Sequence, residues 1–360
     1  MRRLKAAIGL ALAAACLYFV FRNVDVGAVA EAFGQFKAYW LLPALALYAA
    51  DYWLRAERWR ELLAPIQKAK TATLLDLLVI GNTVNNVLPA RLGDVTRAVL
   101  CKRRFGMSRS SALATIFVEK IGDGVATLGF FLAAVALSPK DLGQHGGVKE
   151  LVGGMTESQF VSWMNLAMRV SAWIFGLALL FSILGIAFRS RTARLIEWTA
   201  ARAPGRLGAT LHRIGHMFLE GLSVLKSPAG MAATAVITLL LWAAEAGVYY
   251  TIGRGFHEPI PFAAIVMLVA IVNLAVMLPS SPGFWGPFEL VAIGVLKLFG
   301  VSGGVAVAFT LVTHLFLIVP LAGAGALAMA REHLHLKDVR EAETSAAEPD
   351  PEESVEGSNA

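Results

Sequence analysis

The stretch Asn85–Arg97, N-N-V-L-P-A-R-L-G-D-V-T-R, decides the fold, because it breaks an apolar run with residues that a continuing helix would not contain. It follows the apolar run L-L-D-L-L-V-I after the four residues G-N-T-V, and it holds a proline, two asparagines, two arginines and an aspartate. Proline removes a backbone donor and breaks the helical hydrogen-bond ladder. We therefore expect this stretch to be the tip of a helical hairpin that lines a polar site.

The composition places that hairpin in a membrane. Of 360 residues, 57% are hydrophobic and 16% charged, whereas a soluble domain has roughly 25% charged residues. Residues 341–360 hold seven acidic and no basic side chains, so the net charge of +6 becomes 6 + 7 = +13 for the rest. We predict a membrane domain over residues 1–337 and a disordered acidic cytoplasmic tail over 338–360. Cys16 and Cys101 make no disulfide framework.

Six stretches approach the roughly 20 apolar residues that a spanning helix needs. They are Leu4–Phe21, Ala38–Leu54, Ala112–Leu137, Leu166–Phe188, Met231–Gly253 and Val305–Ala330. The first is alternatively a cleaved signal peptide, but no A-x-A-like site precedes a soluble domain. Basic residues accumulate on the cytoplasmic side, and here they follow alternate spans. We therefore expect a multi-pass all-α protein with both termini in the cytoplasm.

Two further apolar stretches are interrupted by polar, helix-breaking residues. Thr71–Leu100 has basic residues at both ends, and its 30 residues are too few for two crossings. Pro261–Gly300 is broken by P-S-S-P-G-F-W-G-P. Irregular backbone at membrane depth persists only where protein buries it or where it lines a water-filled cavity. Both stretches are therefore predicted to be re-entrant hairpins, although eight or more full crossings are an alternative.

The two hairpins share the pattern L-P-x-x-x-G and occupy the same place in the order of spans. Because the halves begin on opposite sides of the membrane, we predict an inverted repeat of residues 1–160 and 161–337. Interrupted segments in corresponding positions are typical of a transporter's binding site. The residues expected to shape the two turns are Pro89, Gly93, Pro279, Pro282, Gly283 and Gly286.

Three motifs resemble a known family. P-A-R-L-G-D-V-T-R at Pro89–Arg97, V-E-K-I-G-D at Val118–Asp123 and L-P-S-S-P-G-F-W-G-P-F-E at Leu278–Glu289 are similar to the lysylphosphatidylglycerol synthase transmembrane-domain family, which includes flippase-like, YbhN-type proteins. One departure is Lys120, where the family commonly has arginine. The resemblance covers about residues 5–330 and implies movement of lipids between leaflets of a bacterial inner membrane.

We expect no enzyme activity. Aminoacylating members of that family carry a fused soluble synthase domain, and few residues follow the last expected span here. A polytopic glycosyltransferase is the enzyme alternative, but the predicted outer loop over residues 138–160 offers Asp141, Glu150 and Glu157 without a recognisable motif. No G-x-x-x-x-G-K-[ST] motif is present, so we expect no ATP, no other cofactor and no metal.

Charged residues at membrane depth are the candidate site, because such groups are costly in a bilayer. Glu119 and Asp123 are four residues apart and share one helix face. Under the functional hypothesis Arg91, Arg97 and Lys120 attract a lipid phosphate, while Asp94, Glu119 and Asp123 hold these cations in place. The alternative is a structural ion-pair cluster that fastens the first hairpin to the next span. Asn85 and Asn86 would contact head-group oxygens or cap the broken helix.

The second half adds further titratable side chains. Glu245 is a candidate proton or ion-coupling residue, or a hydrogen-bond partner of a neighbouring span. Glu289 would titrate during transport, or bond the amides of the second turn. His314 is expected to be packed and hydrogen-bonded, and Asp51 is expected to pair with Arg55. The tryptophans predicted to anchor at the membrane interface are Trp53, Trp59, Trp163, Trp173 and Trp285.

Together these observations predict a flippase or transporter for an anionic lipid or a lipid-linked molecule. The alternative is an accessory protein that presents lipid to a separate enzyme without transporting it. Expected partners are membrane lipids, a separate lipid-modifying enzyme or a second copy of the chain, and no nucleic acid.

Overall fold

The computed structural model describes residues 14–18, 22, 24–87, 92–138, 156–205, 208, 212, 215, 228–277 and 282–333, and all regular structure in these ranges is helical. The all-α prediction is therefore confirmed for the described part of the chain. Pro89, Arg91, Pro279, the acidic tail and most of the expected span Leu4–Phe21 lie outside the described residues.

The first part of the chain forms helices that are joined by short turns. Asp25 caps α2, and Ser108 caps the long helix α6 by accepting the N–H of Ser111 at 3.0 Å. Gly106, with φ of 71°, ends α5 in the left-handed conformation that glycine adopts readily. The elements are α2 (Val26–Gly34), η1 (Ala38–Trp40), α3 (Leu41–Leu63), α4 (Thr71–Val87), α5 (Gly93–Phe105) and α6 (Arg109–Leu137).

In the second part of the chain, long helices come before and after two shorter helices. Thr156 and Gln159 form a capping box that starts α7, and Pro287 stands in the first turn of α12, where a missing N–H does no harm. The elements are α7 (Glu157–Ala187), α8 (Arg189–Arg202), α10 (Pro228–Gly253), α11 (Phe262–Met277), η3 (Pro282–Phe284), α12 (Pro287–Leu298) and α13 (Gly303–Arg331).

Four described helices are long and apolar enough to cross a membrane, and each contains most of a predicted span. They are Arg109–Leu137, Glu157–Ser182, Ala229–Gly253 and Gly303–Arg331. The helix α3 has 23 residues, but its second half carries several charges. Among these charged side chains, Arg55 and Arg58 form ion pairs with other helices. The four apolar helices indicate a multi-pass membrane protein.

Each predicted polar break separates two helices that pack against each other. The first hairpin consists of α4 and α5, and the second of α11, η3 and α12. In the first hairpin, a Cβ added to Gly93 would lie 1.9 Å from the carbonyl oxygen of Gly81, so the two helices approach more closely than any side chain permits. In the second, Gly283 (φ 64°) and Gly286 (φ 98°) supply left-handed backbone. The glycines predicted to shape the turns therefore do so.

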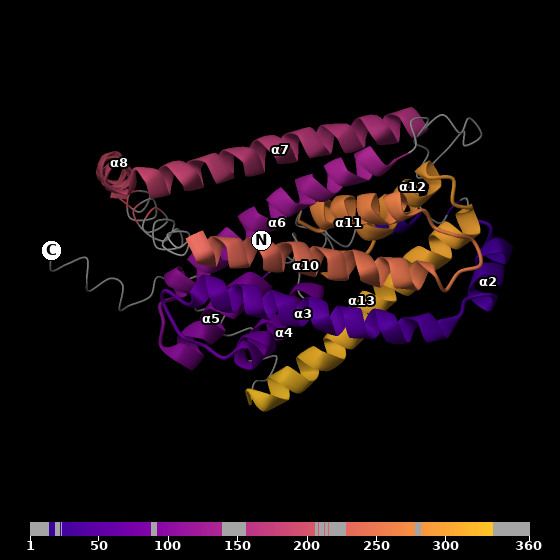
Figure 1. Ribbon diagram of the computed structural model, residues 1–360, viewed down its shortest axis with the longest axis horizontal. Helices are drawn as coiled ribbons and strands as arrows, with labels where there is room; N and C mark the ends of the chain where they lie inside the picture. The colour runs from indigo at the N-terminus through magenta and orange to yellow at the C-terminus, as the bar shows by residue number, and fades with distance from the viewer. Residues whose placement is uncertain are drawn as a thin grey trace.

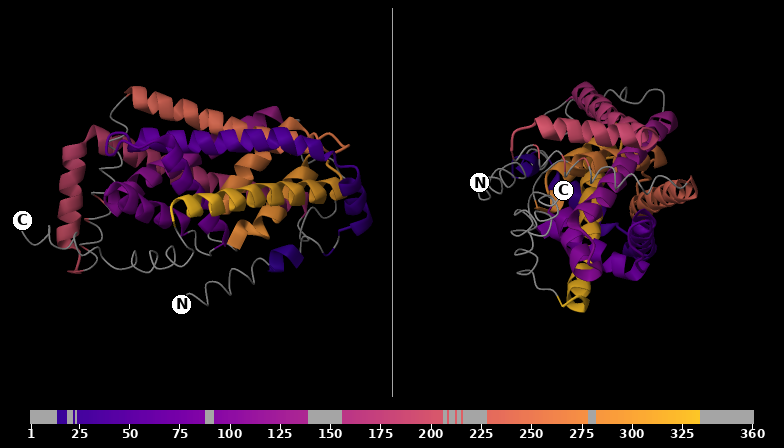
Figure 2. Two further views of the ribbon diagram at one scale, coloured as in Figure 1. Left: turned by 90° about the horizontal axis from the view of Figure 1, so that it is seen from below. Right: turned by 90° about the vertical axis from the view of Figure 1, so that its left-hand side faces the viewer.

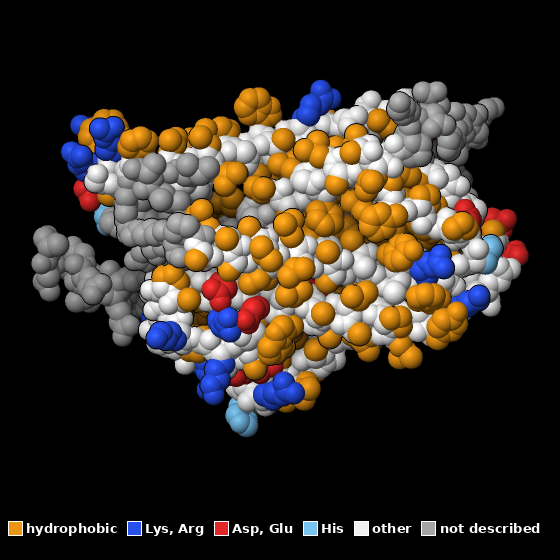
Figure 3. Space-filling view, viewed as in Figure 1, with side chains coloured by type: hydrophobic (Ala, Val, Ile, Leu, Met, Phe, Trp, Pro, Cys, Tyr) orange, Lys and Arg blue, Asp and Glu red, His pale blue; other side chains and the backbone are white. Residues whose placement is uncertain are grey.

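The long helices run roughly along one axis of the molecule, and the hairpins lie towards opposite ends of it (Figure 1). Helices α3 and α10 are side by side in both orientations, and α13 passes beneath them (Figures 1 and 2). Hydrophobic side chains cover the middle of the face seen in Figure 3, while most charged side chains gather towards its two ends. Such a band is what a bilayer requires of the surface that it contacts.

Candidate functional site

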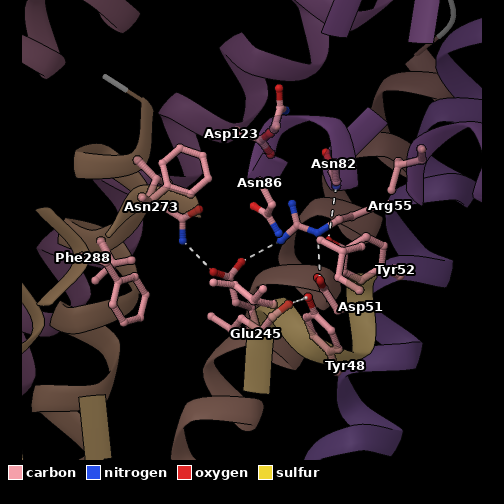
Figure 4. Close-up of a pocket in the computed structure, with 18 of the residues that line it drawn as sticks. Tyr48, Asp51, Tyr52, Arg55, Asn82, Asn86, Asp123, Glu245, Asn273 and Phe288 are labelled. Carbon is pink, nitrogen blue, oxygen red and sulfur yellow. Dashed lines mark hydrogen bonds and ion pairs between the residues drawn. The ribbon is translucent and has the colours of Figure 1, made fainter. Parts of the chain in front are cut away.

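A polar cavity lies inside this apolar bundle. Its volume is about 220 Å³, which equals the volume of roughly seven water molecules in the liquid. Figure 4 shows side chains from several helices converging on it. The polar and aromatic groups of its wall are Tyr48, Asp51, Tyr52, Arg55, Asn82, Asn85, Asn86, Arg97, Glu119, Lys120, Asp123, Glu245, Tyr249, Asn273, Phe284, Phe288 and His314.

The described residues on either side of the two hairpin breaks meet at this cavity. Asn86, in the last turn of α4, and Gly283, in η3, both line it, and a Cβ built on Gly283 would lie 3.5 Å from the carbonyl oxygen of Asn86. Asn85 accepts the N–H of Gly93 through its side-chain oxygen at 2.7 Å. Of the two roles predicted for Asn85, capping of the broken helix is therefore observed. Asn86 is among the side chains that point to the cavity (Figure 4).

Arg97 fastens the first hairpin to α6. Its two terminal nitrogens donate to the two carboxylate oxygens of Glu119 at 3.2 and 2.9 Å, and the Arg97 side chain is only 2% exposed. Its guanidinium also stacks on the ring of Trp59, with its central carbon 4.0 Å from the ring centre. The geometry matches the predicted structural ion-pair cluster. A direct role of Arg97 in lipid binding stays a prediction.

Arg58 completes this buried cluster and was missed by the sequence analysis. It donates to Asp123 at 2.6 Å and lies 3.7 Å from Glu119, with its side chain 1% exposed. Arg58 belongs to the basic residues that follow the expected span Ala38–Leu54, and in the sequence analysis such residues mark only the cytoplasmic side. The spacing of Asp51, Arg55 and Arg58 could have indicated that Arg58 faces the site, because these three residues fall on one helix face.

The prediction that Trp59 anchors at the membrane interface is wrong. Its ring is fully buried, and its indole N–H donates to Thr115 at 3.1 Å. A local sequence cannot separate an interfacial tryptophan from one that covers a buried ion pair. Trp285 instead packs on His314, with ring centres 4.5 Å apart. The exposed side chains of Trp53, Trp163 and Trp173 agree with the prediction for them.

Asp94 and Lys120 lie at the edge of the same cluster. Asp94 is 3.7 Å from Arg97 and 3.9 Å from Lys120, near the upper limit for an ion pair. The Lys120 side chain is 35% exposed, against 2% for Arg97. Lys120 is therefore the predicted cation that has the most access to a molecule in the cavity, while Arg91 lies outside the described residues.

A second ion-pair cluster joins the two halves of the chain. Arg55 of α3 donates to Asp51 at 2.8 Å and to Glu245 of α10 at 2.7 Å. Asn273 of α11 donates to the other oxygen of Glu245, also at 2.7 Å (Figure 4). The predicted Asp51–Arg55 pair is confirmed. Glu245 is hydrogen-bonded to neighbouring helices, which was one of the two roles predicted for it. Arg55 and Asn273 had not been proposed as cavity groups.

Glu289 holds the second turn. It is fully buried, and its Oε2 accepts the N–H of Gly286 at 2.6 Å. Its Oε1 lies 2.5 Å from Nδ1 of His314, whose Nε2 lies 2.8 Å from the carbonyl oxygen of Gly283. The predicted bond between Glu289 and the amides of the turn is therefore observed, and His314 is packed and hydrogen-bonded as expected.

Taken together, the cavity has mixed charge. Among the described residues, the ion pairs in its wall and directly behind it join the cations Arg55, Arg58, Arg97 and Lys120 to the carboxylates of Asp51, Asp94, Glu119, Asp123 and Glu245. The three arginines are each held by carboxylates. The site therefore suits a ligand that offers both hydrogen-bond donors and acceptors better than it suits a bare anion.

A cavity with many polar side chains, lined by parts of two hairpins within a helical membrane bundle, defines the class, an integral membrane protein. The chain belongs to the family described as the lysylphosphatidylglycerol synthase TM region, whose model matches residues 6–325. No solved structure matches it.

Three relatives are similar over different shares of the chain. "Glycosyltransferase AglD" of Haloferax volcanii is 25% identical over 306 residues, which cover 80% of this chain and 48% of that protein. A UPF0104 membrane protein of Methanothermobacter thermautotrophicus is 22% identical over 67% of this chain and 70% of its own length. Another, from Methanocaldococcus jannaschii, is 37% identical over 57 residues. The chain thus spans about half the length of the glycosyltransferase that it matches.

Proposed function

We propose that this protein moves a lipid, or a lipid-linked molecule with a phosphate-bearing head group, across a bacterial inner membrane. The observation that carries the proposal is a polar cavity inside an apolar bundle, with the tips of two hairpins in its wall. A head group crossing the bilayer needs polar partners throughout, whereas its acyl chains can stay in the surrounding lipid.

In the proposal, the two hairpins control access to the cavity through which the head group crosses the membrane. In the proposal they enter the membrane from opposite sides as parts of an inverted repeat, and both termini lie in the cytoplasm. Because the tips meet at the cavity, withdrawal of either hairpin would open the cavity towards one side only. Alternating access around a fixed site is the behaviour expected of such repeats.

The lining suggests which groups contact the head group. Lys120 is the most exposed of the predicted cations and can attract a phosphate, while Asn86 and Asn273 offer amides to phosphate or hydroxyl oxygens. Arg97 and Glu119 would support the site from behind. Hence the proposal favours an anionic phosphate head group that also carries hydrogen-bond donors such as hydroxyls, and assigns recognition of its phosphate to Lys120 more than to Arg97.

The proposal is of a transporter and not of an enzyme. The relative named as a glycosyltransferase is twice as long as the segment that matches it, so its name does not define the activity of this region. The second candidate function is an accessory protein that presents lipid to a separate enzyme. The 35% exposure of Lys120 would serve that function equally, so only a measurement of translocation separates the two.

The test is translocation of fluorescent lipids in proteoliposomes, with anionic phosphatidylglycerol and zwitterionic phosphatidylcholine as probes. We expect the protein to accelerate translocation of the anionic probe above the rate in protein-free vesicles. Lys120→Gln should slow the anionic probe about tenfold, as loss of a charge-assisted phosphate contact does, and the zwitterionic probe less.

The matched control is Arg331→Gln, which removes an exposed cation that pairs with Asp76 at the end of α13, outside the cavity. This variant should translocate both probes at the wild-type rate. Binding of lipid without any acceleration by the wild-type protein would overturn the transport proposal in favour of the accessory function. Equal slowing of both probes in Lys120→Gln would remove Lys120 from head-group recognition.

A further inference from the structure

His314 and Glu289 are placed so that they must share a proton. A backbone carbonyl can only accept a hydrogen bond, so Nε2 of His314, at 2.8 Å from the carbonyl oxygen of Gly283, carries a hydrogen. The backbone N–H of Gly286 donates to Oε2 of Glu289. The 2.5 Å contact between Nδ1 and Oε1 therefore holds one hydrogen, which belongs either to an imidazolium or to a carboxylic acid.

The surroundings confine this proton to the pair. Glu289 is fully buried and His314 is 3% exposed, and the imidazole lies between the rings of Trp285 and Phe288, with ring centres 4.5 and 4.2 Å away. An unpaired charge is costly in such surroundings. With one proton the pair is neutral overall, and all three hydrogen bonds are made.

We infer that His314 and Glu289 form a proton-binding site that controls the second hairpin, which gives the proposed transporter its coupling ion. Uptake of a second proton leaves an imidazolium beside a neutral carboxylic acid, so the buried pair gains a net charge and the contact loses its charge-assisted character. Release of the shared proton leaves a neutral imidazole whose lone pair faces a carboxylate across the 2.5 Å contact, with no hydrogen between them. The first change weakens the bond between α12 and α13, and the second removes it.

The hydrogen bond between Glu289 and His314 lies at the turn of the second hairpin, so its loss would free the hairpin that acts as a gate in the proposed function. Glu289 and His314 together hold both glycines of the turn, Gly283 through its carbonyl and Gly286 through its N–H. Gly283 and His314 also line the cavity, so a change in the protonation of the pair would alter the wall of the proposed head-group site. A proton entering from the cavity would thus reach the pair at the imidazole.

Other titratable groups surround the pair and need separate control. Cys16, in the N-terminal segment, interacts electrostatically with Glu289. From α4 and α11 the cavity receives amide side chains at Asn82, Asn85, Asn86 and Asn273. The titratable and charged groups in the cavity wall are Tyr48, Asp51, Tyr52 and Arg55 of α3, Arg97 of α5, Glu119, Lys120 and Asp123 of α6, and Glu245 and Tyr249 of α10.

Glu289→Gln separates a proton-binding role from a merely structural one. The glutamine amide can donate to Nδ1 of His314 while its oxygen accepts the N–H of Gly286, so every hydrogen bond is kept. The amide cannot gain or lose a proton in this range, and protonation of the imidazole is disfavoured because its Nδ1 already accepts the amide N–H. A structural role would survive this substitution, whereas a proton-dependent release of the turn would not.

The experiment is hydrogen exchange of the full-length protein in vesicles of phosphatidylethanolamine and phosphatidylglycerol, between about pH 5 and 8, where histidine ordinarily titrates. Rates are corrected for the intrinsic effect of pH. In the wild type, protection of peptides covering residues 282–290 should change by about tenfold or more when the pair opens, while peptides of α5 stay constant. In Glu289→Gln the turn should remain protected throughout.

Constant protection of this turn in the wild type would overturn the inference without reference to any variant. The same pH dependence in Glu289→Gln would assign the change to another group, and Cys16→Ala tests one such group. The measurement needs no translocation of lipid. Its failure is therefore distinguishable from failure of the proposed function.

Discussion

The two hairpins are built alike but fastened differently. In each, the second helix of the hairpin contributes a buried charged side chain that pairs with the long helix that follows: Arg97 with Glu119 of α6, and Glu289 with His314 of α13. An arginine stays charged at any pH that a protein meets, so the first pair is permanent. The second pair depends on one proton. We therefore expect the first hairpin to stay fastened when the pH changes and the second hairpin to respond to its proton.

The strongest test of this comparison exchanges carboxylate for amide in each pair. Glu119→Gln leaves Arg97 and Arg58 without the carboxylate that both contact, and breaking a buried ion pair costs about 3–5 kcal/mol. We expect a large loss of folded protein in detergent. Glu289→Gln, which keeps its hydrogen bonds, should retain wild-type yield and melting temperature. Equal losses in the two variants would erase the difference between the hairpins.

The close contact within the first hairpin gives the next largest effect. Gly93→Ala would place a methyl group 1.9 Å from the backbone oxygen of Gly81, so the helices must separate. Overpacking of this kind costs about 1–3 kcal/mol, and we expect a lower melting temperature. The control is Gly122→Ala on α6, where nothing lies within 4 Å of the added atom. That variant should be neutral or slightly more stable, by about 0.5–1 kcal/mol.

Trp59 supports only the first pair, and its replacement should have an intermediate effect. Trp59→Phe keeps most of the buried ring but removes the N–H that Thr115 accepts. Loss of one buried hydrogen bond costs about 1–2 kcal/mol. Thermal unfolding should show a decrease in melting temperature, and hydrogen exchange should rise in α5 but not in residues 282–290. A change in both hairpins would show that they are not fastened independently.

The smallest expected effect is that of Lys120→Arg. It restores the residue that the resembled family commonly has and keeps the charge near Asp94. A surface-accessible substitution of this kind usually changes stability by less than about 0.5 kcal/mol. Translocation of the anionic probe should be retained or somewhat faster, because arginine can bind phosphate through two parallel hydrogen bonds. Loss of transport in this variant would indicate that the position requires the shape of lysine.

The sequence by itself determined the membrane class, the places where helices break and the presence of the carboxylates Glu119, Asp123 and Glu289 within apolar runs. These are local properties: hydropathy is summed over adjacent residues, proline and glycine act on their own backbone, and a charge in an apolar run stands out where it occurs. For the same reason glycine was expected at the hairpins, where Gly283 and Gly286 have positive φ and Gly93 lets α4 and α5 approach closely.

Only the tertiary structure decided which distant partners neutralise the buried charges, whereas the pair of Asp51 and Arg55, four residues apart, was predicted from the sequence. Arg58 reads as part of a basic helix end, yet it is buried against Asp123, 65 residues away. Arg55 reaches Glu245 across 190 residues, and His314 reaches Glu289 across 25. A local pattern can show that a charge needs a partner in an apolar environment. Which side chain provides it depends on how the helices pack, because helices far apart in the chain place their side chains at one cavity.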